Sequence, residues 1–165
     1  MKESESPDQF IFRWSGDIFT KIFLLINLIQ MIYHILDIFF ILFHSSLVIF
    51  NLFGWILQRT RIWNLFTLLF TGASWIILGL IVGTLGYCPL TEWHFNVLLR
   101  LGESNLPNSY IKYLTERITG LDVSASLVDK VTLYSFIAAL TISLFLNIRD
   151  FRIKKKIKNI KTIPD

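Results

Sequence analysis

The chain has 165 residues, of which 53% are hydrophobic and only 17% are charged, so it is more apolar than a typical soluble domain of this length. Its net charge of +4 is concentrated near the C-terminus without an accompanying folded basic face, which argues against nucleic-acid binding. A single cysteine excludes an internal disulfide and says nothing firm about the redox compartment.

Residues 1–17 form a polar N-terminal tail that begins MKESESPDQF. This tail is acidic, unlike the basic n-region of a secretory signal, and the apolar block after it is far longer than a signal's apolar core. We therefore expect no cleavage. The chain does not begin Met-Gly and its cysteine is internal, so we also expect no lipid anchor.

A nearly unbroken apolar stretch covers residues 18–57. As a helix it would be about 60 Å long, twice what a bilayer needs, so it is more than one simple span. Lys21, Asn27 and Gln30 make the first part more polar. This pattern predicts an interfacial helix over 18–32 and a first membrane span over 33–57. The alternative is two short spans with a turn near 27–34, where the sequence has no Gly or Pro.

The rest of the chain continues this membrane domain, which covers residues 18–149. The short link QRTR is long enough only for an antiparallel helical hairpin and leads to a second span at 62–87. Residues 88–129 are polar and predict an outer loop with short helices near 92–101 and 109–118. A third span at 130–148 precedes a basic tail, 150–165. The predicted fold is an all-α integral membrane bundle with about three transmembrane helices.

The distribution of basic residues predicts the orientation. The three-span arrangement places nine Lys and Arg next to span ends on one side, which the positive-inside rule assigns to the cytoplasm. We therefore expect a multi-pass protein of the cell inner membrane, with a cytoplasmic C-terminus and an outward-facing loop. Seven of these cations lie close together and predict contact with anionic lipid. They are Arg149, Arg152, Lys154, Lys155, Lys156, Lys158 and Lys161.

Asp37, His44 and Asn51 lie seven residues apart in the predicted first span, so they share one face of the helix. A carboxylate and an imidazole cost several kcal/mol in hydrocarbon unless they are paired or hydrated, so this polar stripe does not face lipid. Intramembrane ionisable residues often mark proton relays, ligand pockets or cofactors. The bland interpretation is that the stripe only packs or is hydrated.

The second and third predicted spans also carry faces suited to helix packing. Four glycines of the second span cluster on one side and allow close approach of another helix. They are Gly72, Gly79, Gly83 and Gly86. Small and polar residues form further faces on both spans and predict a tight bundle. They are Asn64, Thr67, Thr71 and Ser74, and Thr132, Ser135, Ala139 and Ser143.

The second span ends in GTLGYCPLTEW, which contains the only cysteine. Pro89 cannot continue the helix, and Thr91 can cap a new helix that begins at Glu92. A corner therefore explains these residues better than a catalytic site. A nucleophilic Cys88 would need a basic partner, of which His94 is the nearest in sequence, and no catalytic signature surrounds the pair.

Metal and haem sites are less favoured by the spacing of the candidate ligands. Cys88, Glu92 and His94 match no standard zinc pattern. His34 and His44 lie about 15 Å apart along one helix and cannot sandwich one haem, although His34 and His94 could meet near the outer surface. We therefore expect no cofactor and no metal.

Several of these motifs resemble a family of small bacterial integral membrane proteins, catalogued as domain of unknown function 2784. The most specific is CPLT, comprising Cys88, Pro89, Leu90 and Thr91. YHILDIFFILFHSSLVIFNLFG looks like the family's first helix, and LGE at 101–103 and YIKYL at 110–114 resemble its later motifs. The resemblance covers about residues 31–149 and implies a fold and a location without an activity.

This chain departs from the family pattern at three positions. His94 stands where the family usually has a Glu, three residues after the Thr. The family has a His early in the second helix, and residues 64–66 of this chain contain none. In the later motif the family has a His before the Tyr, whereas here Lys112 directly precedes Tyr113. These departures weaken a metal or haem proposal further.

These observations favour a non-enzymatic accessory or interaction subunit, which would contact a membrane-protein partner or a second copy of itself. The alternative is a membrane-embedded proton-coupled or redox site, built on Asp37 and His44. Substitution of His44 separates them, because a packing residue tolerates the change and a proton carrier does not.

Overall fold

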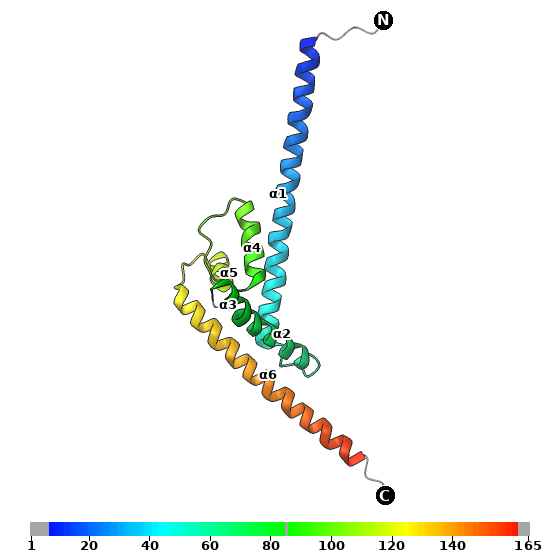
Figure 1. Cartoon of the computed structure of the whole chain (residues 1–165), viewed down its shortest axis with the longest axis vertical. Helices are drawn as coiled ribbons and strands as arrows, with labels where there is room; N and C mark the ends of the chain where they lie inside the picture. Colours follow the sequence, from blue (N-terminus) through cyan, green and yellow to red (C-terminus); the bar gives the residue numbers. More distant parts are fainter. Residues whose placement is uncertain (1–6, 85, 162–165) are drawn as a thin grey trace.

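Figure 1 shows the computed structural model of the chain, which describes residues 7–84 and 86–161, with side chains described for 17–84 and 86–159. All regular elements of these residues are helices, as predicted. The order is α1 (Pro7–Phe53), α2 (Arg61–Ala73), a π-helical turn (Ser74–Leu78), α3 (Gly79–Val82), α4 (Pro89–Arg100), α5 (Tyr110–Thr119) and α6 (Ala125–Lys161).

Helix α1 is one continuous rod, so the alternative prediction of a turn near 27–34 is wrong. Residues 17–53 contain neither Gly nor Pro, and nothing in the sequence interrupts the backbone hydrogen bonds. No break separates the predicted interfacial helix from the predicted first span. The helix ends at Phe53 and not at 57, because the chain turns at Gly54.

The second span is shorter than predicted at its C-terminal end. Helix α2, the π-helical turn and α3 run without interruption from residue 61 to 82, where Gly83 adopts φ of +81° and ends the helix. A left-handed backbone suits glycine because it has no Cβ. The predicted extension to residue 87 is therefore wrong.

The third span is longer than predicted at both ends. Helix α6 begins at Ala125, inside the predicted outer loop, and continues to Lys161. The basic tail predicted at 150–165 is therefore largely an extension of this helix, within the residues that the structure describes. The polar connection between α3 and α6 contains α4 and α5, close to the short helices predicted at 92–101 and 109–118. We call residues 88–124 the cap.

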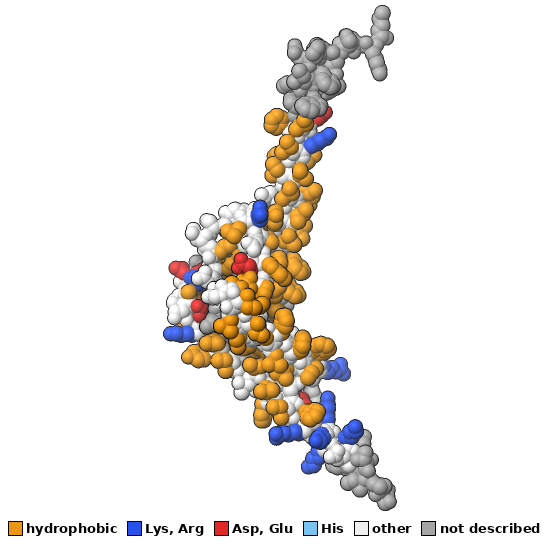
Figure 2. Space-filling view, viewed as in Figure 1, with side chains coloured by type: hydrophobic (Ala, Val, Ile, Leu, Met, Phe, Trp, Pro, Cys, Tyr) orange, Lys and Arg blue, Asp and Glu red, His pale blue; other side chains and the backbone are white. Residues whose placement is uncertain are grey.

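Three helical segments are long and apolar enough to cross a membrane, and they cover residues 17–53, 61–82 and 125–159. Their exposed side chains are mostly hydrophobic, as Figure 2 shows for one face of the molecule. In Figure 1, α6 passes across the lower end of α1, while α4 lies beside the C-terminal half of α1. The N-terminal part of α1 extends beyond the other helices.

Polar side chains make up nearly half of the buried residues that the structure describes, six against seven hydrophobic ones. Ala139 and Ser143 of α6 and Asn64 of α2 are buried, which agrees with the predicted inward faces, and Leu68 of α2, which the prediction did not include, is buried as well. At the start of α2, Arg61 donates to the carboxylate of Asp150 in α6 at 2.7 Å. The side-chain amide of Asn147 donates to the Arg61 carbonyl at 3.1 Å. Polar contacts thus hold α2 against α6.

Candidate functional site

The carboxylate of Asp37 is the centre of a charged cluster between α1 and the cap. Asp37 is 5% exposed, and Arg117 of α5 donates to its two oxygens through two different nitrogens, each at 3.0 Å. His94 of α4 contacts Oδ1 through Nε2 at 2.8 Å. Since an ionised carboxylate only accepts hydrogen bonds, Nε2 of His94 carries the hydrogen. We call Asp37, His94, Arg117 and Tyr113 the Asp37 clasp.

Aromatic rings surround His94 and fix its orientation. The imidazole has no exposed surface and stacks on Phe40 with ring centres 5.6 Å apart. Tyr113 meets it edge to face at 5.5 Å, and the Tyr113 hydroxyl accepts a hydrogen bond from Arg117. Among the described residues, Nδ1 of His94 has no hydrogen-bond partner. Helix α4 is therefore held to α1 by both packing and charge.

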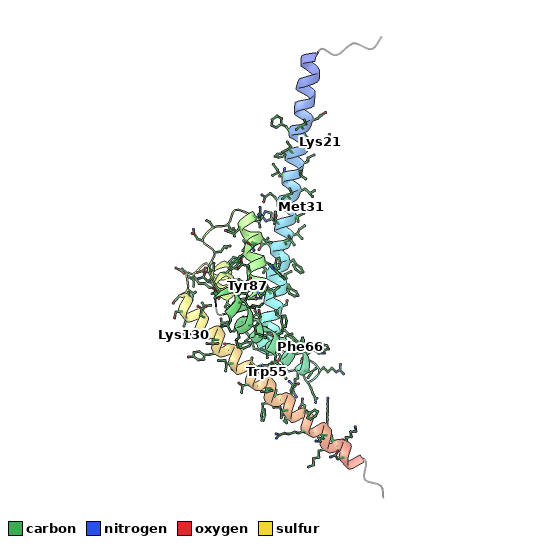
Figure 3. All side chains as sticks on the ribbon, in the orientation of Figure 1. Lys21, Met31, Trp55, Phe66, Tyr87 and Lys130 are labelled. Atoms are coloured by element: carbon green, nitrogen blue, oxygen red, sulfur yellow. The ribbon has the colours of Figure 1, made fainter. Side chains whose placement is uncertain are left out.

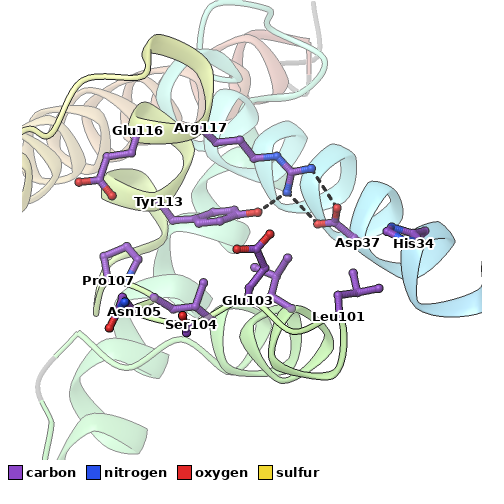
Figure 4. Close-up of a pocket in the computed structure, with 12 residues that line it drawn as sticks. His34, Asp37, Leu101, Glu103, Ser104, Asn105, Pro107, Tyr113, Glu116 and Arg117 are labelled. Carbon is purple, nitrogen blue, oxygen red and sulfur yellow. Dashed lines mark hydrogen bonds and ion pairs between the residues drawn. The ribbon is translucent and has the colours of Figure 1, made fainter. Parts of the chain in front are cut away.

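Residues of the Asp37 clasp also line a pocket of about 480 Å³ at the edge of the cap. Figure 4 shows that Asp37 and Arg117 lie on one side of it and that the Glu103 carboxylate points toward them. The polar residues at this pocket are His34, Asp37, Glu103, Ser104, Asn105, Tyr113, Glu116 and Arg117. Three of these side chains are acidic and one is a guanidinium, which pairs with Asp37.

The surroundings of the cap residues shift their protonation in a consistent direction. The hydrogen bond to Asp37 raises the pKa of the Arg117 guanidinium, which therefore stays charged. Burial raises the pKa of the Tyr110 and Tyr113 hydroxyls, against an opposing effect of the Arg117 charge. At neutral pH the two phenols are uncharged and the guanidinium is the fixed cation of the clasp.

His44 lies one step along the polar stripe from Asp37 and has different partners. It is 6% exposed, and its ring stacks on Tyr110 with centres 3.7 Å apart. Nε2 faces the sulfur of Cys88 at 3.9 Å. The Tyr110 hydroxyl in turn donates to the Ile41 carbonyl at 3.3 Å and contacts Ser45. The imidazole that accompanies Cys88 is therefore that of His44 and not that of His94.

Asn51, the third residue of the stripe, has a structural environment. Its amide donates to Thr71 of α2 at 3.0 Å. Nearby, the fully buried Asn64 donates to the carbonyls of Phe50 and Asn51 at 2.7 and 3.2 Å. These carbonyls belong to the last turn of α1, where backbone acceptors run short of intrahelical donors; the Phe50 carbonyl also accepts from the Gly54 amide at 2.8 Å. The two asparagines therefore stabilise the hairpin between α1 and α2.

The four glycines predicted to pack helices have different positions. Gly79 is buried, and a Cβ on Gly72 would lie 3.2 Å from the Phe136 ring of α6, so this helix approaches closely there. Gly83 and Gly86 lie outside the helix, with positive φ, and a Cβ on either would meet nothing within 4 Å. Their prediction as parts of one helical face is wrong, because the helix ends at Val82.

The CPLT segment begins α4, as the corner interpretation expects, although the capping residue differs. Pro89 is the first residue of the helix, and Cys88 precedes it in an extended conformation. Leu90 and Thr91 lie within the first turn, so the prediction that Thr91 caps the helix is wrong. Proline suits the first helical position because that position needs no amide hydrogen.

The structure does not assemble the metal ligands considered from the sequence. Among the described residues, no three His, Cys, Asp or Glu side chains lie close enough to hold one ion. His94 is bonded to Asp37, while Cys88 faces His44.

Sequence reasoning did not find Arg117, Tyr110 or Tyr113 as members of the site. Tyr113 follows Tyr110 by three residues and Arg117 follows Tyr113 by four, so the three side chains share one face of α5. This pattern was a usable signal for a face that contacts another helix. The partner of that face was not visible, because Asp37 precedes Arg117 by 80 positions.

Comparison with known families places the chain in one of them. The family described as Protein of Unknown function (DUF2784) matches residues 34–148, which is more than half of the chain, and the chain belongs to this family. The match covers the polar stripe, the CPLT segment, the cap and most of the apolar part of α6. No curated protein and no solved structure matches the chain.

Proposed function

We propose that this member of the DUF2784 family is a non-enzymatic accessory subunit of the bacterial inner membrane, which contacts a partner membrane protein through the N-terminal half of α1. The observation that carries the proposal is the extension of α1 beyond the bundle. Residues 19–32 are all exposed, mostly apolar, and about 21 Å long as a helix (Figure 3).

This part of α1 is suited to an apolar environment. Its side chains include nine large hydrophobic residues more than 45% exposed, among them Phe23, Leu24 and Leu25. The amide of Asn27 donates to the Phe23 carbonyl of the same helix at 2.8 Å, so its hydrogen-bonding capacity is partly met internally. Within the described part of the chain these residues form no packed core. Lipid or a helix of another protein covers such a surface in a membrane.

The Asp37 clasp supports the accessory interpretation over proton transport. A carboxylate that carries protons alternates between charged and neutral forms. Asp37 instead shares its two oxygens with a guanidinium, an arrangement that favours a permanent negative charge. The clasp therefore serves to hold the cap on α1.

Site-specific photocrosslinking in intact membranes tests this proposal. A photoreactive residue at Leu24 or Leu28 of α1 should give a crosslinked protein of one discrete mass. The matched control is Leu80 on α3, which is also apolar and exposed. Lipid adducts alone at all three positions would contradict the proposal, and a species of twice the chain's mass would identify a second copy as the partner.

The second candidate function is a proton-coupled or redox site built on Asp37 and His44. One observation favours it: Nδ1 of His44 is buried without a partner among the described residues. The protein reconstituted in vesicles with a pH-sensitive dye tests this candidate. It predicts a proton flux that His44→Phe abolishes, whereas the accessory role predicts no flux in either protein.

A further inference from the structure

The segment after α3 folds back along the helix that it has just left. The Gly86 amide donates to the Trp75 carbonyl at 3.3 Å, and the Ser74 hydroxyl donates to the Tyr87 carbonyl at 3.4 Å. Trp75 precedes the helix end at Val82 by seven residues, or about 10 Å. Cys88 therefore lies within the apolar length of this candidate span, beside a π-helical turn of the kind often found at functional sites.

The fold places the Cys88 thiol directly opposite a buried imidazole. The sulfur lies 3.9 Å from Nε2 of His44, at the long limit for a hydrogen bond to sulfur. His44 is only 6% exposed, and Tyr110 covers one face of its ring. Nδ1 of His44 has no hydrogen-bond partner among the described residues. Cys88 itself is half-buried and is a free thiol.

We propose that Cys88 and His44 together bind one soft monovalent metal ion, Cu(I). A thiolate sulfur and a neutral imidazole are ligands that Cu(I) prefers. Metal bonds are about 2.3 Å long to sulfur and about 2.0 Å long to nitrogen, on the values known for zinc. A sulfur and a nitrogen that bind one ion therefore lie at most about 4.3 Å apart. The observed separation of 3.9 Å accommodates an ion with a bent geometry and no movement of either helix.

Charge balance in the apolar surroundings favours a monovalent ion. On binding, the S–H bond of Cys88 breaks and its proton leaves for solvent, while Cu–S and Cu–N bonds form and the oxidation state stays Cu(I). The product is neutral, so it avoids the cost of a buried net charge. A zinc ion would keep a positive charge on these two ligands and would need two more. No third His, Cys, Asp or Glu lies close enough among the described residues.

Anaerobic titration of the full-length protein in mild detergent tests the proposal, with Cu(I) alone in competition with a chromophoric chelator. We expect one Cu(I) per chain. Cys88→Ser should weaken binding by about 100-fold or more and His44→Phe by about tenfold or more, since even changes beyond the ligands themselves often cost about 10- to 100-fold. His34→Phe removes another α1 histidine, about 15 Å away, and should leave the affinity unchanged.

X-ray absorption of the Cu(I)-loaded wild-type protein gives a second readout that does not depend on a variant folding. We expect one sulfur and at least one nitrogen neighbour at the copper. An affinity unchanged by His44→Phe, or copper with sulfur and no nitrogen neighbour, would overturn the pair and leave an isolated thiol. Absence of stoichiometric binding to the folded wild-type protein would overturn the site altogether.

Discussion

Asp37 and Arg117, which are 80 positions apart, meet in a two-pronged ion pair with both N–O distances at 3.0 Å. The contact connects the C-terminal half of α1 to α5 and is reinforced by His94 from α4. Three helices of the DUF2784 domain therefore converge on one carboxylate. This convergence, together with the ring stacking of His94 on Phe40 and of Tyr110 on His44, holds the cap on α1.

Removal of the Arg117 guanidinium should loosen the cap. Arg117→Gln leaves the buried carboxylate of Asp37 with His94 as its only partner in the clasp, and it should destabilise the fold by about 2–3 kcal/mol. This loss is smaller than that for a fully buried ion pair, because the Arg117 side chain is 42% exposed. Thermal unfolding in detergent measures the change.

The control for this variant is Arg100→Gln, which changes another exposed cap arginine and should have a much smaller effect. The double variant Asp37→Asn with Arg117→Gln should cost less than the two single changes together, because no charge is then left unpaired. Additive effects would show that the two residues do not interact.

Most of the helices were predictable from the sequence because their cause is local. Long apolar runs without Gly or Pro have no other stable form in a membrane than a helix. The helix ends were less predictable. Changes of polarity suggested helix boundaries within α1 and at the start of the basic tail. Both helices continue through these points, because the sequence has no helix stop signal there.

The candidate site was predictable only on one of its sides. The period of seven identified Asp37, His44 and Asn51 as one buried face. The partners of His44 and Asp37 lie 44 to 80 positions away, and their pairing depends on how the cap folds back. The back-folding itself follows from hydrogen bonds at Gly86 and Tyr87 that no local pattern specifies.

Asn64 should be important for the hairpin between α1 and α2. Asn64→Leu keeps the volume but leaves the Phe50 and Asn51 carbonyls without these donors, which should cost about 1–3 kcal/mol. Thr67→Val is the control, since its hydroxyl bonds only within α2. Equal unfolding temperatures for the two variants would contradict this role of Asn64.

Gly54 should tolerate substitution less well than Gly72, although only Gly72 was predicted to pack. A Cβ on Gly54 would lie 2.6 Å from the Phe50 carbonyl oxygen, whereas one on Gly72 would meet a Phe136 ring atom at 3.2 Å. Gly54→Ala should therefore destabilise the protein by about 1–3 kcal/mol. Gly72→Ala needs only a small ring movement. Thermal unfolding of both variants gives the comparison, and a larger loss for Gly72→Ala would refute it.

Alkaline pH should release the cap. Burial raises the pKa of the Tyr110 and Tyr113 hydroxyls in the folded protein, so the folded state holds these protons more tightly than the unfolded state. The resulting stability is fully present below the unfolded pKa of about 10 and is lost as pH rises through the folded values. Unfolding temperature measured across this range should fall.

The double variant Tyr110→Phe with Tyr113→Phe provides the check on this assignment. It should start from a lower stability, because the Tyr110 hydroxyl no longer donates to Ile41, but its stability should depend less on pH above about 10. An unchanged slope would assign the alkaline transition to other groups.

Anionic lipid should protect the basic end of α6 from trypsin. The side chains of residues 151–159 are exposed on this helix, and the cluster includes Lys154, Lys155, Lys156 and Lys158. Each cation near an anionic surface gains about 1 kcal/mol, so in nanodiscs with phosphatidylglycerol the helix should lie against the lipid and be cut slowly. Neutral nanodiscs should give fast cleavage.

Raising the salt to about 1 M shortens the Debye length to about 3 Å and should abolish the difference between the two lipids. Protection that persists in high salt would mean that apolar contacts of Phe151, Ile153 and Ile157 hold the helix end instead.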